Sequence, residues 1–347
     1  MDFINIKNEK SFDKYAIELF NYHFKKNKFY RAYCESLNIN NSEVDQIEKI
    51  PFFPIIFFKN KKILIDNIDF QKLFKSSGTG GSKSSHYIHK IDDYHISIEK
   101  CFERIYGKVT DYVIIGVTPN YTTKKTSSLI YMINHLIQKS NKKQSQFIMD
   151  LKKFKSVTKE LETANKKYII YGLSYALMDL IEKNKFDLKN SIIIETGGMK
   201  GSREEIDKEN LHKILSTAFN TNKIHSEYAM TELMSQSYSL KNQIFSTPAW
   251  KKILIKDFND PMNVSRVGRG FLNIIDLANK YSCPFISTED VGEVFENGEF
   301  KHPVNEITIA GNFKDMFKNI ILANDLEFEY SANSPTMMIE GMTVAGK

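Results

Sequence analysis

Apolar side chains recur with helical spacing near the start of the chain. From Phe12 to Phe24 they return every three or four residues, which predicts an amphipathic helix with Ser11 as its N-cap. A second short helix is expected to begin near Ser42 and to end before Pro51. The aromatic segment at 50–58 contains two prolines, so it is expected to form an extended, buried connector.

From residue 94 to residue 228, short apolar runs alternate with amphipathic ones. Helices are expected at 94–106, 127–137, 156–164, 174–182 and 204–218. Strands are expected at 111–117, 147–149, 168–172, 191–198 and 223–228. This alternation predicts an α/β fold with a largely parallel sheet flanked by helices, in which ligands bind at the carboxyl ends of the strands.

After about residue 250 the pattern changes to strands without long helices. Expected strands lie at 252–255 and 271–276, and Asn297-Gly298 stands between alternating apolar residues, which favours a hairpin. We therefore expect a β-rich subdomain packed on the α/β part.

Composition narrows the class of protein. With 347 residues and 41% hydrophobic residues the chain can fold as two domains, or as one large domain with an appendage. The net charge of +6 is small for this length and no basic cluster is present, so no nucleic-acid partner is expected. Three cysteines far apart in the sequence argue against a disulfide framework or a zinc site. The N-terminus lacks the features of a signal peptide, and the longest apolar stretch is too short to span a bilayer, so we expect a cytoplasmic protein without a membrane span.

Candidate chemistry begins with the segment 74–83, Phe-Lys-Ser-Ser-Gly-Thr-Gly-Gly-Ser-Lys. It has three glycines and four hydroxyl residues, a composition typical of a phosphate-binding loop and also of a solvated linker. It is not a Walker A motif, because Ser82 stands where glycine is required before Lys-Ser. The glycine spacing does not fit the dinucleotide motif either.

Three further segments combine turn residues with chemical groups. Residues 195–201 end a strand in a glycine pair, which lets backbone lie flat against a purine or simply makes a tight turn. In residues 227–236 a tyrosine could stack on a base, a threonine could contact a phosphate and a carboxylate could hold a magnesium ion. The alternative is the start of a helix with Thr231 as its N-cap. Residues 287–292 place a carboxylate before a glycine, suitable for ribose hydroxyls or for a surface turn.

These four motifs in this order resemble the core motifs of adenylate-forming enzymes. The chain is most similar to acyl-protein synthetases of the LuxE type, which are related to phenylacetate–CoA ligases, and the resemblance covers roughly residues 45–315. It implies an adenylate-forming core over 1–310, with a helical part at 1–72, an α/β part with ATP motifs at 73–249 and a β-rich subdomain at 250–310. Residues 311–347 would be a short or truncated C-terminal lid.

The resemblance also implies roles for single residues. ATP phosphates would be held by the loop residues Ser76, Ser77, Gly78, Thr79 and Gly80. Gly197 and Gly198 would flank adenine, and Tyr228 would stack on the base. Thr231 would contact the α-phosphate, Glu232 would bind magnesium and Asp290 would hold the ribose. The implied reaction joins a carboxylic acid, a fatty or other acyl acid, to AMP and then passes the acyl group to a thiol.

The chain departs from the family pattern at three places. Gly80-Gly81 replaces a second threonine in the loop, and Gly311-Asn312 stands where Gly-Arg is expected. Residues 318–320 lack the cysteine that takes the acyl group in LuxE-type enzymes, and Cys283 is expected to be a packed residue instead. Lys314, Lys318 and Lys347 are the candidates for the lysine that a full lid would supply.

Without that cysteine, the thiol acceptor would be external: an acyl carrier protein, CoA or a reductase subunit. Two other hypotheses remain open. The chain is a degenerate nucleotide- or acyl-partner-binding subunit of an acyl-reductase complex, or a nucleotidyltransferase that adenylates another group.

Overall fold

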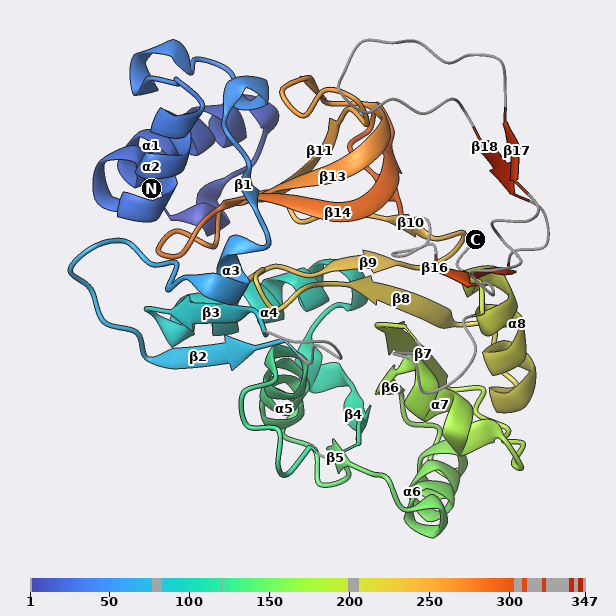
Figure 1. Cartoon of the computed structure of the whole chain (residues 1–347). Coiled ribbons are helices and arrows are strands. Elements are labelled where there is room, and N and C mark those ends of the chain that lie inside the picture. The colour runs from blue at the N-terminus through green and yellow to red at the C-terminus, as the bar shows by residue number, and fades with distance from the viewer. Residues whose placement is uncertain are drawn as a thin grey trace.

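Two large sheets and the helices around them, with three further two-stranded sheets, make up the described part of the structure, a computed structural model (Figure 1). It describes residues 2–76, 83–119, 121–198, 206–302, 308–310, 320–322, 337–339 and 343–345. Ser77, Gly78, Thr79 and Gly80 of the glycine-rich segment, and Lys314, Lys318 and Lys347, lie outside the described residues.

The first sheet has six strands among the described residues, in the order β5-β4-β6-β7-β8-β9. The first five are mutually parallel and β9 pairs antiparallel with β8. The strands are β4 (Val113–Val117), β5 (Gln146–Phe147), β6 (Tyr168–Leu173), β7 (Ser191–Thr196), β8 (Ile224–Tyr228) and β9 (Ser237–Ser239). The expected α/β fold with a largely parallel sheet is confirmed.

Helices cover both faces of this sheet because the strands are apolar on both sides. Ile114 and Ile169 join the core formed with α4 (Ile91–Tyr106) and α5 (Ser128–Ser140). Their neighbours Ile115 and Ile170 face the opposite way, toward a second core. That core is formed with α6 (Leu151–Thr163), α7 (Ser174–Ile181) and α8 (Lys208–Phe219). Each of these five helices falls close to its expected range.

The second sheet is antiparallel and comes mostly from the part after residue 250, as expected. Its order is β10-β15-β14-β13-β11-β12, with β1 parallel to β14. The strands are β1 (Phe53–Pro54), β10 (Ile244–Phe245), β11 (Lys251–Lys256), β12 (Val264–Ser265), β13 (Gly268–Asp276), β14 (Phe285–Val294) and β15 (Phe300–Lys301). The Asn297-Gly298 turn joins β14 to β15, and Gly298 has the positive φ of +79° that such a turn needs.

The N-terminal part differs from the expectation in detail. The first helix, α1 (Glu9–Lys26), is capped by Asn8, and Ser11 completes the capping box from inside the helix. A helix that the pattern missed, α2 (Lys28–Ser36), follows at once, while the expected helix near Ser42 is only a pair of 3-10 turns. The aromatic connector contains a short helix, α3 (Phe57–Asn60). The 3-10 turns are η1 (Phe3–Asn5), η2 (Asn41–Glu43), η3 (Ile47–Lys49) and η4 (Val109–Asp111).

The glycine-rich segment joins the two strands of a hairpin, β2 (Lys72–Lys75) and β3 (Ser85–Ile88). Figure 1 shows this hairpin beside α4 and below α3. Phe74 anchors the hairpin, since its ring is 1% exposed and lies against Tyr94 and Tyr131.

After residue 302 the described strands pair only with one another. They are β16 (Thr308–Ala310) with β19 (Thr343–Ala345), and β17 (Ile320–Leu322) with β18 (Met337–Ile339). Within the described ranges, no helix has both the length and the apolar character needed to cross a bilayer.

Candidate active site

A cavity of about 280 Å³ opens at the carboxyl ends of the parallel strands. Pro119 follows β4, Leu173 ends β6, Gly197 follows β7 and Ala229 follows β8, and all four line the cavity. This is where an α/β sheet places its ligands, because neighbouring strand ends and the loops after them converge there.

The mouth of the cavity is basic. Lys75 and Lys83 come from the two ends of the glycine-rich segment, and Lys124 comes from the loop before α5. Ser127 caps α5 through the backbone N–H of Ile130, so the positive end of a 13-residue helix also meets the cavity. These groups favour an anionic ligand.

Ser76 is the one glycine-loop candidate within the described residues, and it lines the cavity. Its backbone N–H donates to the carbonyl of Ser84, and its hydroxyl accepts from the N–H of Ser84 at 3.0 Å. The hairpin is therefore closed at the base of the glycine-rich segment, which holds both ends of that segment beside the cavity.

Gly197 follows β7 with a φ of +69°, a conformation that favours glycine. Its carbonyl accepts from the Ser174 hydroxyl at 2.8 Å and from the Lys208 ammonium at 3.1 Å. Gly198 is partly buried beside it. Side chains of α7 and α8 therefore hold the backbone directly after β7 in place, while residues 199–201 of the motif lie outside the described residues.

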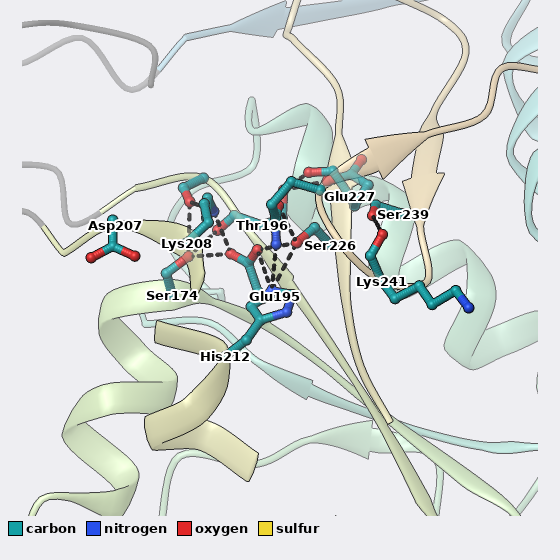
Figure 2. A network of polar contacts seen from close by, with 12 residues as sticks. Ser174, Glu195, Thr196, Asp207, Lys208, His212, Ser226, Glu227, Ser239 and Lys241 are labelled. Carbon is teal, nitrogen blue, oxygen red and sulfur yellow. Dashed lines mark hydrogen bonds and ion pairs between the residues drawn. The ribbon is translucent and has the colours of Figure 1, made fainter. Parts of the chain in front are cut away.

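Glu195, two residues before Gly197, is the centre of the network in Figure 2. Its carboxylate is fully buried and accepts from Ser174 at 2.6 Å, from Lys208 at 2.7 Å and from Ser226. His212 lies 3.4 Å away on the same carboxylate. Burial raises the pKa of Glu195, but Lys208 and His212 outweigh it and bring the pKa down to about 2. The carboxylate is therefore charged and ties β7, β8, α7 and α8 together beside Gly197.

Residues 229–236 form a turn and extended backbone, so the alternative of a helix capped by Thr231 is wrong. Thr231 lines the cavity, and its carbonyl lies 2.8 Å from Nδ1 of the buried His86. The other ring nitrogen of His86 lies 3.0 Å from the side-chain oxygen of Asn279, and the amide nitrogen Nδ2 of Asn279 donates to the carbonyl of Glu232. Burial lowers the pKa of His86, whereas its contacts with Asn279 and Thr231 raise it, and the ring braces the backbone of Thr231 against Asn279.

Glu232 has a buried carboxyl group, 4% exposed, that makes no ion pair with any described residue. Burial raises its pKa, Ser84 lowers it by hydrogen bonding, and Asp290 raises it by repulsion. Two neighbouring carboxyl groups with no basic partner at hydrogen-bonding distance suit a cation that takes oxygen ligands.

Tyr228 and Asp290 meet across the two sheets, where the tyrosine hydroxyl donates to Asp290 at 2.6 Å. The ring of Tyr228 is only 5% exposed, because Phe245, Phe300 and His302 surround it edge-on. Little of its face is open to a base in this structure. Tyr228 instead orients the aspartate.

The structure therefore divides the predicted site residues into two groups. Ser76, Gly197 and Thr231 line the cavity. Tyr228, Glu232 and Asp290 form an adjoining cluster, linked by one hydrogen bond and by mutual electrostatic effects on their pKa values.

Sequence reasoning missed two polar residues of the cavity wall, Glu227 and Gln236. Both belong to the motif at 227–236, in which the ligand-binding roles were assigned to Tyr228, Thr231 and Glu232 instead. Their signal is their position: Glu227 lies within the buried strand β8 and Gln236 directly precedes β9, and such positions are usually apolar.

Four buried side chains contact Ser235, and one of them is Ser97 of α4, whose hydroxyl lies 3.0 Å from the Ser235 hydroxyl. Asp276 accepts from the backbone N–H and the hydroxyl of Ser235 at 2.9 and 2.7 Å. Lys251 donates to its carbonyl at 3.0 Å and Trp250 donates to its hydroxyl at 2.8 Å. The cavity wall from Thr231 to Gln236 is thus fixed at both ends.

Cys34, Cys101 and Cys283 are all buried and unpaired. Burial raises the pKa of Cys34 and Cys101 to about 12 and raises that of Cys283 further. Such thiols are inert, as expected of Cys283. The residues that the structure describes contain no group of three or more His, Cys, Asp or Glu side chains that could hold a metal ion.

Known proteins similar to this chain include ligases that cover most of its length. It is 25% identical over 319 residues to the long-chain-fatty-acid–luciferin-component ligase of Aliivibrio fischeri, across 82% of this chain and 79% of the relative. The protein of the same name from Vibrio harveyi is 24% identical, across 85% and 82%. The chain is a homologue of these LuxE-type ligases.

Solved structures of adenylate-forming enzymes share its fold. The 2-hydroxyisobutyryl-CoA ligase in complex with 2-HIB-AMP and CoA has a TM-score of 0.58 at 14% identity, over 86% of this chain and 68% of that one. An ATP-bound RpMatB–BxBclM chimera has a TM-score of 0.52 at 12% identity, over 72% of this chain and 48% of that one, about half its length. The predicted fold class of this LuxE homologue is confirmed.

The C-terminal part is similar to a different protein. The profile of the PmbA/TldA metallopeptidase C-terminal domain matches residues 271–346. The chain is 45% identical over 53 residues to metalloprotease PmbA of Escherichia coli O157:H7, which is 15% of this chain and 12% of that relative. Asn312 and residues 318–320, where the LuxE homologue departs from the ligase pattern, fall inside this match.

Proposed function

We propose that this LuxE homologue activates a carboxylic acid with ATP, forming an acyl-adenylate and pyrophosphate, and then transfers the acyl group to an external thiol with release of AMP. The observation that carries the proposal is the convergence of Ser76, Gly197 and Thr231 on one cavity with a basic mouth. The reaction needs positioning and neutralisation of phosphate charge, and this mouth supplies both.

Both groups of site residues would contact the nucleotide. The nucleoside would lie against Gly197 and Gly198 and reach the Asp290 carboxylate with its ribose, while the phosphates would lie between Ser76 and Thr231. The acid would occupy the rest of the same cavity, which Ser76, Gly197 and Thr231 also line. The carboxylate oxygen would then attack the α-phosphorus, and pyrophosphate would leave toward the lysines of the mouth. Tyr228 would contact the base only through its small exposed part.

Glu232 would hold the magnesium ion. Its buried carboxyl, repelled by Asp290 and without an ion pair among the described residues, is stabilised when a cation is near. When bound, Mg²⁺ supplies charge neutralisation to the phosphates and orients them. A single protein carboxylate suffices, because Mg²⁺ keeps waters and phosphate oxygens as its other ligands.

The acceptor thiol would come from outside the chain: an acyl carrier protein, CoA or a cysteine of a reductase subunit. All three of the chain's own thiols are buried and protonated, so none can attack the activated carbonyl. We place this reaction in the cytoplasm, where ATP and reduced thiols are available.

Acid-dependent exchange of labelled pyrophosphate into ATP tests the proposal. We expect exchange with some member of a broad panel of carboxylic acids, and calorimetry should detect ATP binding. Absence of both signals would refute the proposed activity.

One observation favours the second candidate, a binding subunit without ligase activity. The segment where the LuxE-type pattern expects an arginine and an acyl-accepting cysteine is the one similar to PmbA. Binding of ATP without any acid-dependent exchange would support this candidate instead.

A further inference from the structure

The cavity of the candidate site has an open mouth and a closed inner end. Lys75, Lys83 and Lys124 are exposed and lie at the mouth. The most deeply buried side chains of the lining mark the inner end and include those of Tyr94, Met132, Thr196, Glu227 and Gln236. A ligand that enters past the lysines meets these five residues at the far end.

Tyr94 and Met132 belong to the packed core of the protein. Tyr94 of α4 is 2% exposed, and its ring lies 5.4 Å from that of Phe74 and stacks on that of Tyr131 at 6.1 Å. Met132 of α5 is 1% exposed and is part of the same core. Because protein interiors are packed about as densely as organic crystals, an alkyl chain cannot pass between these side chains without displacing them.

The rest of the inner end is polar. Thr196, Glu227 and Gln236 stand in this part of the wall, and the hydroxyl of Thr196 donates to the carboxyl group of Glu227. Sites for large apolar ligands are lined mainly by apolar and aromatic side chains. The described residues of the inner end therefore do not form the continuous apolar lining along which a long alkyl chain would extend.

The volume of the cavity limits the size of the acid. A water-sized group takes about 30 Å³, so a cavity of about 280 Å³ holds about nine such groups. On the same scale hexanoate, with about eight non-hydrogen atoms, needs about 240 Å³, whereas tetradecanoate, with about 16, needs about 480 Å³. The α-phosphate beside Thr231 would take further space from the same cavity.

The mouth is unsuited to the part of a long chain that does not fit inside. Lys75, Lys83 and Lys124 lie there together with the positive end of α5. These are the groups toward which pyrophosphate would leave. An alkyl chain at the mouth would cover ammonium groups without pairing them, which is unfavourable.

Accordingly, we infer that the acid activated by this chain is short, with no more than about nine non-hydrogen atoms, and is not a long-chain fatty acid. This inference rests on the proposed acid-activating function and names its substrate class. The side chains that set the limit are Tyr94 and Met132, which close the inner end.

A series of acids of different size tests the inference in the pyrophosphate-exchange assay. The short acids are acetate, butanoate, 3-hydroxybutanoate, hexanoate and benzoate, and the long ones are decanoate and tetradecanoate. We expect the best short acid to have a kcat/KM at least tenfold above that of the best long acid, since a single methylene group in a closed pocket changes specificity by about tenfold or more. A smaller ratio would overturn the inference.

The substitution Met132→Ala enlarges the inner end of the cavity. We expect it to raise the ratio of kcat/KM for octanoate to kcat/KM for butanoate at least fivefold and to leave the KM for ATP unchanged. Ile130→Ala enlarges the same cavity from a partly buried position, so it provides the test if Met132→Ala does not fold.

Met149→Ala is the matched control, because Met149 is 40% exposed and is not among the residues that line the cavity. It should leave the ratio for octanoate and butanoate unchanged. A folded cavity variant whose ratio equals that of the control would contradict the inference.

The same assays separate this inference from the proposed function. Exchange that is best with a long acid would overturn the inference and leave the function intact. If no acid supports exchange, the function fails, and calorimetric titration of octanoate without ATP then decides the inference. It stands if the folded cavity variant binds octanoate at least fivefold more tightly than the unmodified chain and the control does not; no such gain would overturn it.

Discussion

At the scale of single residues, Gly197 links backbone conformation to the candidate nucleotide site. Its φ of +69° costs any other L-residue about 1–2 kcal/mol. We expect Gly197→Ala to lower the free energy of unfolding by about that amount and to raise the KM for ATP, measured by chemical denaturation and by exchange kinetics.

Gly298 supplies the control for this substitution. It has a similar φ of +79° in the hairpin between β14 and β15, outside the candidate site. Gly298→Ala should therefore destabilise the fold to a similar extent without changing the KM for ATP. An equal change in KM in both variants would mean that the effect of Gly197→Ala is only a loss of stability.

Glu232 provides a second test at this scale. Glu232→Gln keeps the size and hydrogen bonding of the side chain but removes the charge that would hold Mg²⁺, so we expect acid-dependent exchange to fall by about 100-fold, several kcal/mol in the barrier. Glu289→Gln, exposed on β14, is the matched control and should retain activity. Full activity of Glu232→Gln at low Mg²⁺ would contradict its assignment.

At the scale of elements, two buried carboxyl groups on neighbouring strands give the fold opposite responses to pH. Burial raises the pKa of Glu195 on β7, but Lys208 and His212 bring it down to about 2, so its stabilising contribution is present above pH 4.5 and is lost as the pH falls toward 2. Burial raises the pKa of Glu227 on β8 to about 7, with Thr196 and Lys251 opposing it. Stability is therefore lost as the pH rises from 4.5 through 7.

The displacement of each pKa from 4.5 corresponds to about 3 kcal/mol. We expect Glu195→Gln to flatten the acid side of the curve of unfolding free energy against pH, and Glu227→Gln to flatten the side between pH 4.5 and 7. Denaturant unfolding at a series of pH values measures both. Identical curves of unfolding free energy against pH for the two variants would contradict the assignment of the acid side to Glu195 and of the range between pH 4.5 and 7 to Glu227.

Local sequence signals determined most elements of the α/β part. The helices near 94–106, 127–137 and 174–182 were predicted because apolar periodicity and tertiary burial coincide there. The same reasoning missed α2 and chose Ser11 over Asn8 as the cap, because short helices and their termini depend on side-chain contacts that periodicity does not reveal.

At the scale of the whole molecule, the chain joins a ligase-like part to a segment similar to the C-terminal domain of a metallopeptidase. The last core residue in the described part of the chain is Phe300, and the strands described beyond residue 302 pair only among themselves. The expectation that residues 311–347 act as a lid remains a prediction.

Truncation tests that prediction directly. We expect the melting temperature of a chain ending at His302 to stay within about 3 °C of that of the full chain, a change of less than about 1 kcal/mol in the free energy of unfolding. The same truncated chain should retain acid-dependent exchange. A chain ending at Gly292 loses the end of β14 and all of β15 and should not fold cooperatively. Loss of exchange with an intact fold in the first variant would establish the segment as a working lid.

The sequence by itself determined the fold class, the order of the motifs and the strand ends at which Gly197 and Thr231 stand. These follow from local patterns, since periodicity and glycine positions report on burial and turns along the chain. Only the tertiary structure decided that Ser76, Gly197 and Thr231 share a cavity while Tyr228 joins Asp290 on the other face of β8. It also placed Glu227 and Gln236, two buried polar residues, in the wall of that cavity, because the position of a buried side chain depends on every segment that surrounds it.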